Sequence, residues 1–159
     1  MKAGIPLKFT IGILLTTLLL TGCGISQSSE HKNSLKNGED NKSSIFEDGM
    51  TATLKEIAPL HYQYQVLNQT NDPITLKFTS SQRIDYSITT KSGEEIFLFS
   101  STAAFLSALG KEEILPEEDF LYDIHLADLR LNKGEYTLSA WMTPKEGKMY
   151  KVSTVIHID

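Results

Sequence analysis

From residue 50 onward, apolar and polar side chains alternate along the chain with a period of two residues. The clearest run is 60–66, in which the even positions are apolar or aromatic and the odd positions are His61, Gln63 and Gln65. Successive side chains of an extended strand point to opposite faces, so this pattern predicts a strand with one buried face.

Similar runs recur to the end of the chain, separated by clusters of turn-forming residues. We count about eight predicted strands, at 51–57, 60–67, 74–79, 84–89, 95–99, 120–126, 136–141 and 150–158. Many short strands without a long helical pattern favour an all-β fold, an antiparallel β-sandwich of the immunoglobulin type. Its large core residues are predicted to be Phe78, Tyr136 and Trp141.

One segment of this region breaks the alternation. Residues 102–109 read Thr-Ala-Ala-Phe-Leu-Ser-Ala-Leu, with Phe105 and Leu109 at a spacing that would share one helix face. We expect a short helix or a loop that covers one end of the sandwich. It lies within the longest connection of the domain, from Ser100 to Pro116.

The first 23 residues predict export and lipid attachment. Lys2 and Lys8 precede an uncharged run from Phe9 to Thr21, which is too short for a membrane-spanning helix but fits a signal peptide. The residues that follow this core, Leu20-Thr21-Gly22-Cys23, resemble a bacterial lipobox. That resemblance implies transfer of a diacylglyceryl group to the Cys23 sulfur, cleavage after residue 22 and a palmitate-bearing lipoprotein. Its two acyl chains would hold the protein on the extracytoplasmic face of the cell membrane.

Residues 23–49 then form a predicted linker between the lipidated Cys23 and a domain at 50–159. Ser, Asn, Gly, Lys and Glu dominate the stretch 24–49. It has too few apolar groups to offset the entropy of ordering it, so we interpret it as a flexible tether, with His31 as a solvated residue.

The net charge argues against nucleic acid as a partner, and the cysteine count argues against a disulfide. The chain has 15 basic and 20 acidic residues, a formal net charge of −5, which becomes −7 when a signal peptide containing Lys2 and Lys8 is removed. A protein that grips nucleic acid through phosphates is normally basic, so nucleic acid is not an expected partner. Cys23 is the only cysteine, which excludes an intrachain disulfide.

The sequence contains no recognisable catalytic or metal-binding motif. A lipidated Cys23 is not a nucleophile, and neither Gly-x-Ser-x-Gly nor Ser-x-x-Lys occurs. Outside the tether, the histidines are His61, His125 and His157, and none has a metal-ligand spacing. The acidic groups at Glu112-Glu113 and Glu117-Glu118-Asp119 are interpreted as a solvated acidic face. We expect no enzyme activity, cofactor or metal.

Short motifs follow one another in order between Val66 and Met142. They are Asn68-Gln69-Thr70, Phe78-Thr79-Ser80-Ser81-Gln82, Asp85-Tyr86, Ser92-Gly93-Glu94, Ile96 to Ser100, Phe105, Leu115-Pro116-Glu117-Glu118 and Gly134-Glu135-Tyr136. This ordered set resembles the bacterial intracellular proteinase inhibitor family, often called BsuPI-type. The chain departs from the family pattern at Ser81, where Gly is usual. The family usually has a tryptophan in the strand that ends in Ser, where this chain has Phe97 and Phe99, and its Pro-Gly-Glu turn is Pro116-Glu117-Glu118 here. By their position after a strand, Ser80 and Gln82 are predicted to bond backbone groups of a bend.

This resemblance implies a module that binds a protein, with a subtilisin-like serine protease as one class of target. The Ser100–Pro116 connection fits an inhibitory contact loop, although its apolar residues 103–106 fit equally a lid on the core. The sequence singles out no reactive bond. The alternatives are a non-inhibitory immunoglobulin-like adhesion or assembly module of the cell envelope, and a hydrolase without a known motif.

Overall fold

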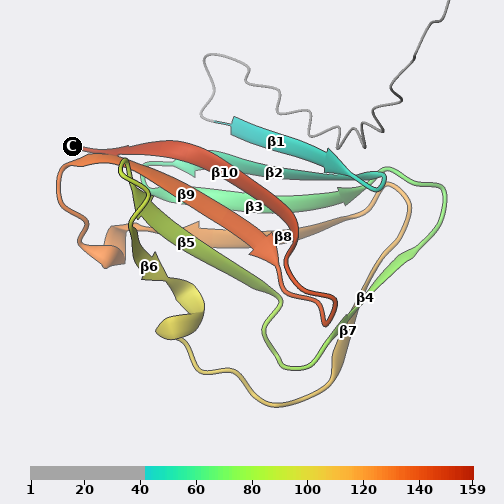
Figure 1. Cartoon of the computed structure of the whole chain (residues 1–159). Coiled ribbons are helices and arrows are strands. Elements are labelled where there is room, and N and C mark those ends of the chain that lie inside the picture. The colour runs from blue at the N-terminus through green and yellow to red at the C-terminus, as the bar shows by residue number, and fades with distance from the viewer. Residues whose placement is uncertain (1–41) are drawn as a thin grey trace, which may run out of the picture. The chain divides into compact units, whose positions relative to one another are not determined.

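The computed structural model describes residues 42–159, which contain ten strands and two short 3-10 helices (Figure 1). The elements in chain order are β1 (Lys42–Glu47), β2 (Met50–Ala58), β3 (His61–Asn68), β4 (Ile74–Phe78), β5 (Ile84–Thr90), β6 (Glu95–Leu98), η1 (Phe99–Ser101), β7 (Gly110–Ile114), β8 (Asp119–His125), η2 (Ala127–Leu129), β9 (Gly134–Met142) and β10 (Met149–Ile158). No helix in this range has the length and apolarity to span a membrane.

The strands form two four-stranded antiparallel sheets and a two-stranded ribbon. One sheet has the order β1-β2-β3-β8 and the other the order β10-β9-β5-β6, while β4 pairs with β7. The two larger sheets pack face to face, as Figure 1 shows, and their inner side chains form one apolar cluster. The predicted all-β sandwich is therefore confirmed.

Two strands occur where the sequence predicted none. β1 lies in the stretch assigned to the tether, and it pairs with β2 over its whole length, with Ile45 against the core. β7 lies in the Ser100–Pro116 connection and pairs with β4. The two strands are held by backbone pairing with a neighbour, but neither shows apolar alternation, because the apolar residues of β1 are the adjacent Ile45 and Phe46 and β7 has only Ile114. The predicted signal peptide, Cys23 and the remainder of the tether lie outside the described residues.

The predicted alternation is confirmed most clearly in β3 and β10, where every second side chain is buried. β5 departs from it, because Asp85 and Ser87, which the pattern placed on a polar face, are also buried. β5 lies inside its sheet between β9 and β6, so neighbouring strands shield these small polar side chains from solvent.

Trp141 is buried as predicted, with 2% of its surface exposed, but it is not part of the core between the sheets. Its neighbours Ala140 and Met142 belong to that core, so Trp141 points to the outer face of the sheet. The ammonium groups of Lys148 and Lys151 lie 4.1 Å and 5.6 Å from the centre of its ring. Two amphipathic side chains thus cover this tryptophan from outside.

A tyrosine links the two sheets through a polar contact. The Tyr64 hydroxyl, fully buried on β3, donates a hydrogen bond of 2.8 Å to the Tyr150 carbonyl on β10. Tyr150 has a left-handed backbone (φ 54°) at an irregularity in the pairing of β10 with β9. The hydrogen bond therefore connects β3 of one sheet to the strained backbone of Tyr150 on β10 of the other.

Burial raises the pKa of Tyr62, Tyr64 and Tyr150, and raises the pKa of Tyr86 to about 12. An unfolded tyrosine ionises near pH 10, so above that pH the folded state holds more protons than the unfolded state. The free energy of unfolding should therefore fall as pH rises above 10.

We predict that Tyr64→Phe reduces this alkaline loss of stability. At pH 7 the variant should be less stable by about 1 kcal/mol, because it lacks the hydrogen bond to Tyr150. At pH 11 the wild type loses about 1.4 kcal/mol through Tyr64 alone, and the variant does not. Urea unfolding followed by the fluorescence of Trp141 at both pH values measures this; an identical pH dependence in the two proteins would contradict it.

Candidate functional site

The connection from η1 to β7 is an irregular, exposed loop, which we call the 102–109 loop. It contains no helix, so the helical alternative for Thr102–Leu109 is wrong. Phe105 packs edge-on against the ring of Phe99, with 5.8 Å between centroids, whereas Leu106 and Leu109 are 74% and 89% exposed. The aromatic contact and the exposure of both leucines are incompatible with a single buried helix face.

The start of this loop is held by Asp85 on β5. One oxygen of the Asp85 carboxylate accepts hydrogen bonds from the backbone N–H groups of Tyr86 and Ser100, both 3.0 Å. The ring of Tyr86 stacks on Phe99 at 4.9 Å, and Phe99 in turn meets Phe105. The Asp-aromatic pair of the family pattern therefore fixes the entry into the loop.

The middle of the loop is held by Ser81, in the bend between β4 and β5. The backbone N–H of Ser81 donates to the carbonyl of Leu106, and the N–H of Leu106 donates to the hydroxyl of Ser81, both at 2.9 Å. The Leu106 carbonyl also accepts the N–H of Ala108 at 2.9 Å. Leu106 is thus fixed through its backbone while its side chain stays exposed.

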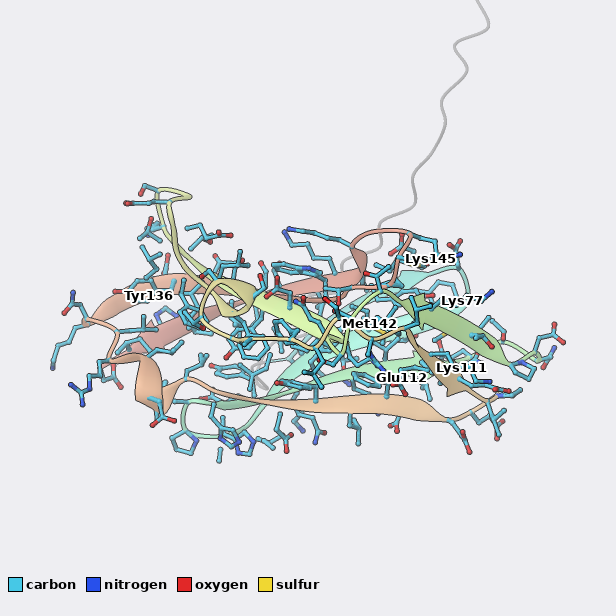
Figure 2. All side chains as sticks on the ribbon, turned by 90° about the horizontal axis from the view of Figure 1, so that it is seen from below. Lys77, Lys111, Glu112, Tyr136, Met142 and Lys145 are labelled. Atoms are coloured by element: carbon cyan, nitrogen blue, oxygen red, sulfur yellow. The ribbon has the colours of Figure 1, made fainter. Side chains whose placement is uncertain are left out.

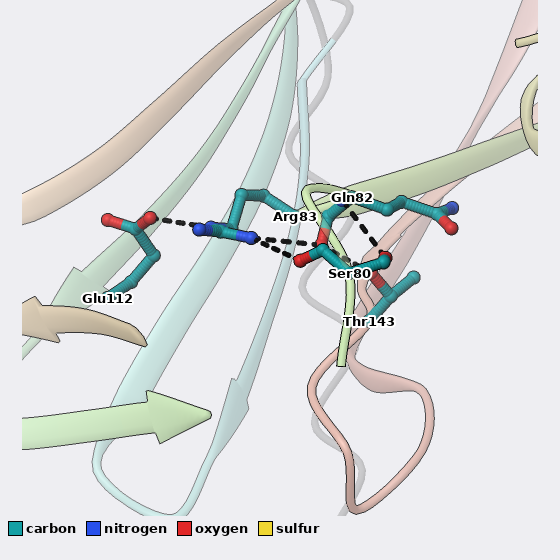
Figure 3. A network of polar contacts seen from close by, with 5 residues as sticks. All are labelled: Ser80, Gln82, Arg83, Glu112 and Thr143. Carbon is teal, nitrogen blue, oxygen red and sulfur yellow. Dashed lines mark hydrogen bonds and ion pairs between the residues drawn. The ribbon is translucent and has the colours of Figure 1, made fainter. Parts of the chain in front are cut away.

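The end of the loop is held by Arg83, whose contacts with Glu112 and Ser80 Figure 3 shows. Its Nε lies 2.6 Å from Oε1 of Glu112 on β7, and its Nη1 donates to the carbonyl of Ser80 at 2.8 Å. The guanidinium also lies 4.6 Å from the ring centre of Phe78 and packs closely against the backbone of Gly110. Glu112, predicted as part of a solvated acidic face, instead joins β7 to the bend.

The bend itself is stabilised as its sequence predicted. The Ser80 hydroxyl accepts the N–H of Gln82 at 3.1 Å, and the Gln82 amide group donates to the carbonyl of Ile84 at 3.1 Å. The turn after β9 is tied to the same place, because Thr143 N–H donates to the Arg83 carbonyl at 3.0 Å. Figure 2 shows Lys77, Lys111, Glu112 and Lys145 gathered at this end of the molecule, away from Tyr136.

The histidines and Glu113, which the sequence offered as candidates, do not form a site with the residues that hold the 102–109 loop. His61 and His125 are cross-strand partners with stacked rings 4.0 Å apart, and His61 lies 3.7 Å from Asp123. Within residues 42–159, no group of three or more potential ligands has the geometry of a metal site. His157 lies on the exposed face of β10, and Glu113 pairs with Lys111 at 3.1 Å.

Sequence reasoning missed the roles of Ser81, Arg83 and Asp85 as supports of the loop. In the sequence, Ser81 stands out only as a departure from the family pattern, and Asp85 only as one half of a motif. The available signal was their position, since all three lie in or beside the bend that enters β5. Their partners are 15 to 29 residues away, and spacing along the chain does not reveal such contacts.

We predict that Ser81→Ala loosens the loop without unfolding the domain. The variant removes the acceptor of the Leu106 N–H, so exchange of that amide with solvent should become about three to ten times faster. The free energy of unfolding should change by less than about 1 kcal/mol, because the site is exposed. Hydrogen exchange measures this, with Ser92→Ala in the distant β5–β6 hairpin as the matched control; unchanged exchange at Leu106 would refute the anchoring role.

Comparison with known proteins assigns this chain to a family. The family model for the intracellular proteinase inhibitor BsuPI matches residues 47–147. The search of curated proteins gave no match. Among solved structures, chicken MD-1 complexed with lipid IVa aligns with 76% of this chain and 100% of its own, at 11% identity and a TM-score of 0.31, which supports no conclusion about the present chain. The match to the family model covers more than half of the chain and includes β2 to β9 in full, and the chain therefore belongs to the BsuPI intracellular proteinase inhibitor family.

Proposed function

We propose that this protein is a lipid-anchored inhibitor of a serine protease on the extracytoplasmic side of the cell membrane, and that the 102–109 loop contacts the protease. The observation that carries the proposal is the way the loop is held. It is exposed at Leu106 and Leu109, yet Asp85, Ser81 and Arg83 support its start, middle and end.

Such a loop suits inhibition for a thermodynamic reason. A flexible segment loses conformational entropy when it binds, whereas a segment already ordered in its bound shape loses little. An ordered loop with exposed apolar side chains can therefore bind tightly through a small surface. Membership of a proteinase inhibitor family supports the same function.

The proposed location rests on the N-terminal sequence. The uncharged run from Phe9 to Thr21 and the Leu20-Thr21-Gly22-Cys23 motif support export followed by lipid attachment at Cys23. The family takes its name from intracellular inhibitors. An exported member would meet proteases of the cell surface or its surroundings, with subtilisin-like enzymes as the first class to test.

We predict that the purified full chain, in mild detergent, inhibits at least one extracellular serine protease in a slow and tight manner. The double variant Leu106→Asp, Leu109→Asp should raise the inhibition constant at least about 100-fold, because each substitution removes an exposed apolar side chain that we expect to contact the protease. Leu121→Asp, at an exposed leucine of β8, is the control and should leave inhibition unchanged.

A panel of subtilisin-like and chymotrypsin-like proteases provides the measurement. If the protein inhibits none of them and crosslinking on intact cells instead captures a structural protein of the envelope, the adhesion or assembly alternative replaces this proposal. If the double variant Leu106→Asp, Leu109→Asp inhibits as well as the wild type, the contact lies outside the 102–109 loop.

The anchor has its own test. Cys23→Ser removes the thiol that receives the lipid, so the variant should leave the membrane fraction or fail to be processed after residue 22. Fractionation of cells and mass measurement of the N-terminal peptide detect both outcomes. A variant that remains firmly in the membrane fraction would contradict lipid attachment at Cys23. Any soluble variant recovered should inhibit the same protease as the wild type, because the loop is unaffected.

A further inference from the structure

The two exposed leucines of the 102–109 loop differ in the contacts of their backbone and in the exposure of their side chains. The Leu106 carbonyl accepts hydrogen bonds from Ser81 N–H and Ala108 N–H, and the Leu106 N–H is bound to the Ser81 hydroxyl. Leu109 has the most exposed side chain among the large apolar residues of the described part of the chain, and it lies directly before β7.

A serine protease requires a free backbone carbonyl group on the inhibitor residue that fills its specificity pocket. The carbonyl oxygen of that residue must enter the oxyanion hole, where the N–H groups of the protease bind it. The Leu106 carbonyl already has two donors inside the protein, so it can enter an oxyanion hole only if the Ser81 contact breaks. The geometry therefore disfavours Leu106 as the pocket residue.

The backbone on both sides of Leu109 is held in place. On the N-terminal side, Ser81 fixes Leu106 three residues away. On the C-terminal side, Gly110 pairs with Phe78 as the first residue of β7, and the guanidinium of Arg83 packs against it. Arg83 is itself bound to Glu112 and to the Ser80 carbonyl. The Leu109–Gly110 peptide bond thus lies between two fixed points.

A bond held in this way resists net cleavage. The protease serine adds to the Leu109 carbonyl carbon and passes its proton to the catalytic histidine, which then gives the proton to the Gly110 nitrogen as the C–N bond breaks. Because β4–β7 pairing and Arg83 keep the Gly110 amine beside the acyl group, that amine can attack the ester, return the proton through the histidine and restore the peptide bond. Hydrolysis by water then competes poorly with the reverse reaction.

We propose that Leu109–Gly110 is the reactive bond of this inhibitor and that the Leu109 side chain fills the specificity pocket of its target. This inference rests on the proposed inhibitory function and narrows it. The target would be a serine protease with an apolar specificity pocket, since a leucine gains from burial there and offers no partner to a pocket that contains a charge.

Leu109→Arg in the full chain tests the assignment by changing specificity. The variant should inhibit the protease with an apolar pocket at least about 100-fold less well than the wild type. It should gain inhibition of trypsin, whose pocket contains an aspartate that pairs with arginine. Leu106→Arg is the matched control, with the same substitution on the same loop, and should keep the wild-type preference.

The chemistry provides a second readout. After long incubation of the wild type with its protease at low pH, a small fraction of cleaved inhibitor should show a new N-terminus at Gly110. A switch of specificity by Leu106→Arg instead of Leu109→Arg, or cleavage at another bond, overturns the assignment while leaving inhibition by this loop intact. A wild type that inhibits no serine protease overturns the proposed function, and the reactive bond with it.

Discussion

The ordering of a long exposed loop depends on the bend between β4 and β5. The chain has no second cysteine, so no disulfide can fix the connection between η1 and β7. Contacts from the bend and the first residues of β5 replace such a covalent link. Asp85 holds the start of the connection, Ser81 its middle and Arg83 its end.

Hydrogen bonds alone do not account for this order. Fixing one residue of backbone costs about 1–2 kcal/mol, while a hydrogen bond contributes about 1 kcal/mol net, and the bonds to Asp85 and Ser81 are fewer than the residues they order. Aromatic packing must contribute as well. Phe99 lies between Tyr86 and Phe105 and also approaches Tyr122 on the opposite sheet at 6.4 Å. Within the 102–109 loop, Phe105 packs on Phe99, whereas the side chains of Leu106 and Leu109 are exposed.

The sequence predicts the sandwich well because burial of one sheet face imposes a pattern with a period of two. That signal locates β3 and β10 and identifies their buried residues. It fails for β1 and β7, whose few apolar residues do not alternate with polar ones, and for Trp141, which is buried on the outer face of its sheet beneath two lysines. The family motifs did not reveal the supports of the loop. Arg83 lies in none of the motifs, Ser81 is a departure from the family pattern, and each support is defined by a partner distant in the chain.

The supports of the loop act mainly on its backbone, and this has a consequence for specificity. Ser81 binds the N–H and the carbonyl of Leu106, Asp85 binds the N–H of Ser100, and Arg83 packs against a residue without a side chain, Gly110. The exposed side chains of the loop can therefore change while every one of these contacts remains. A scaffold built in this way accepts different side chains on the loop without a change in the contacts that hold it. The same scaffold can then serve intracellular inhibitors and a member that we propose acts outside the cell, since a new compartment requires new loop side chains and an N-terminal signal but no change in the fold.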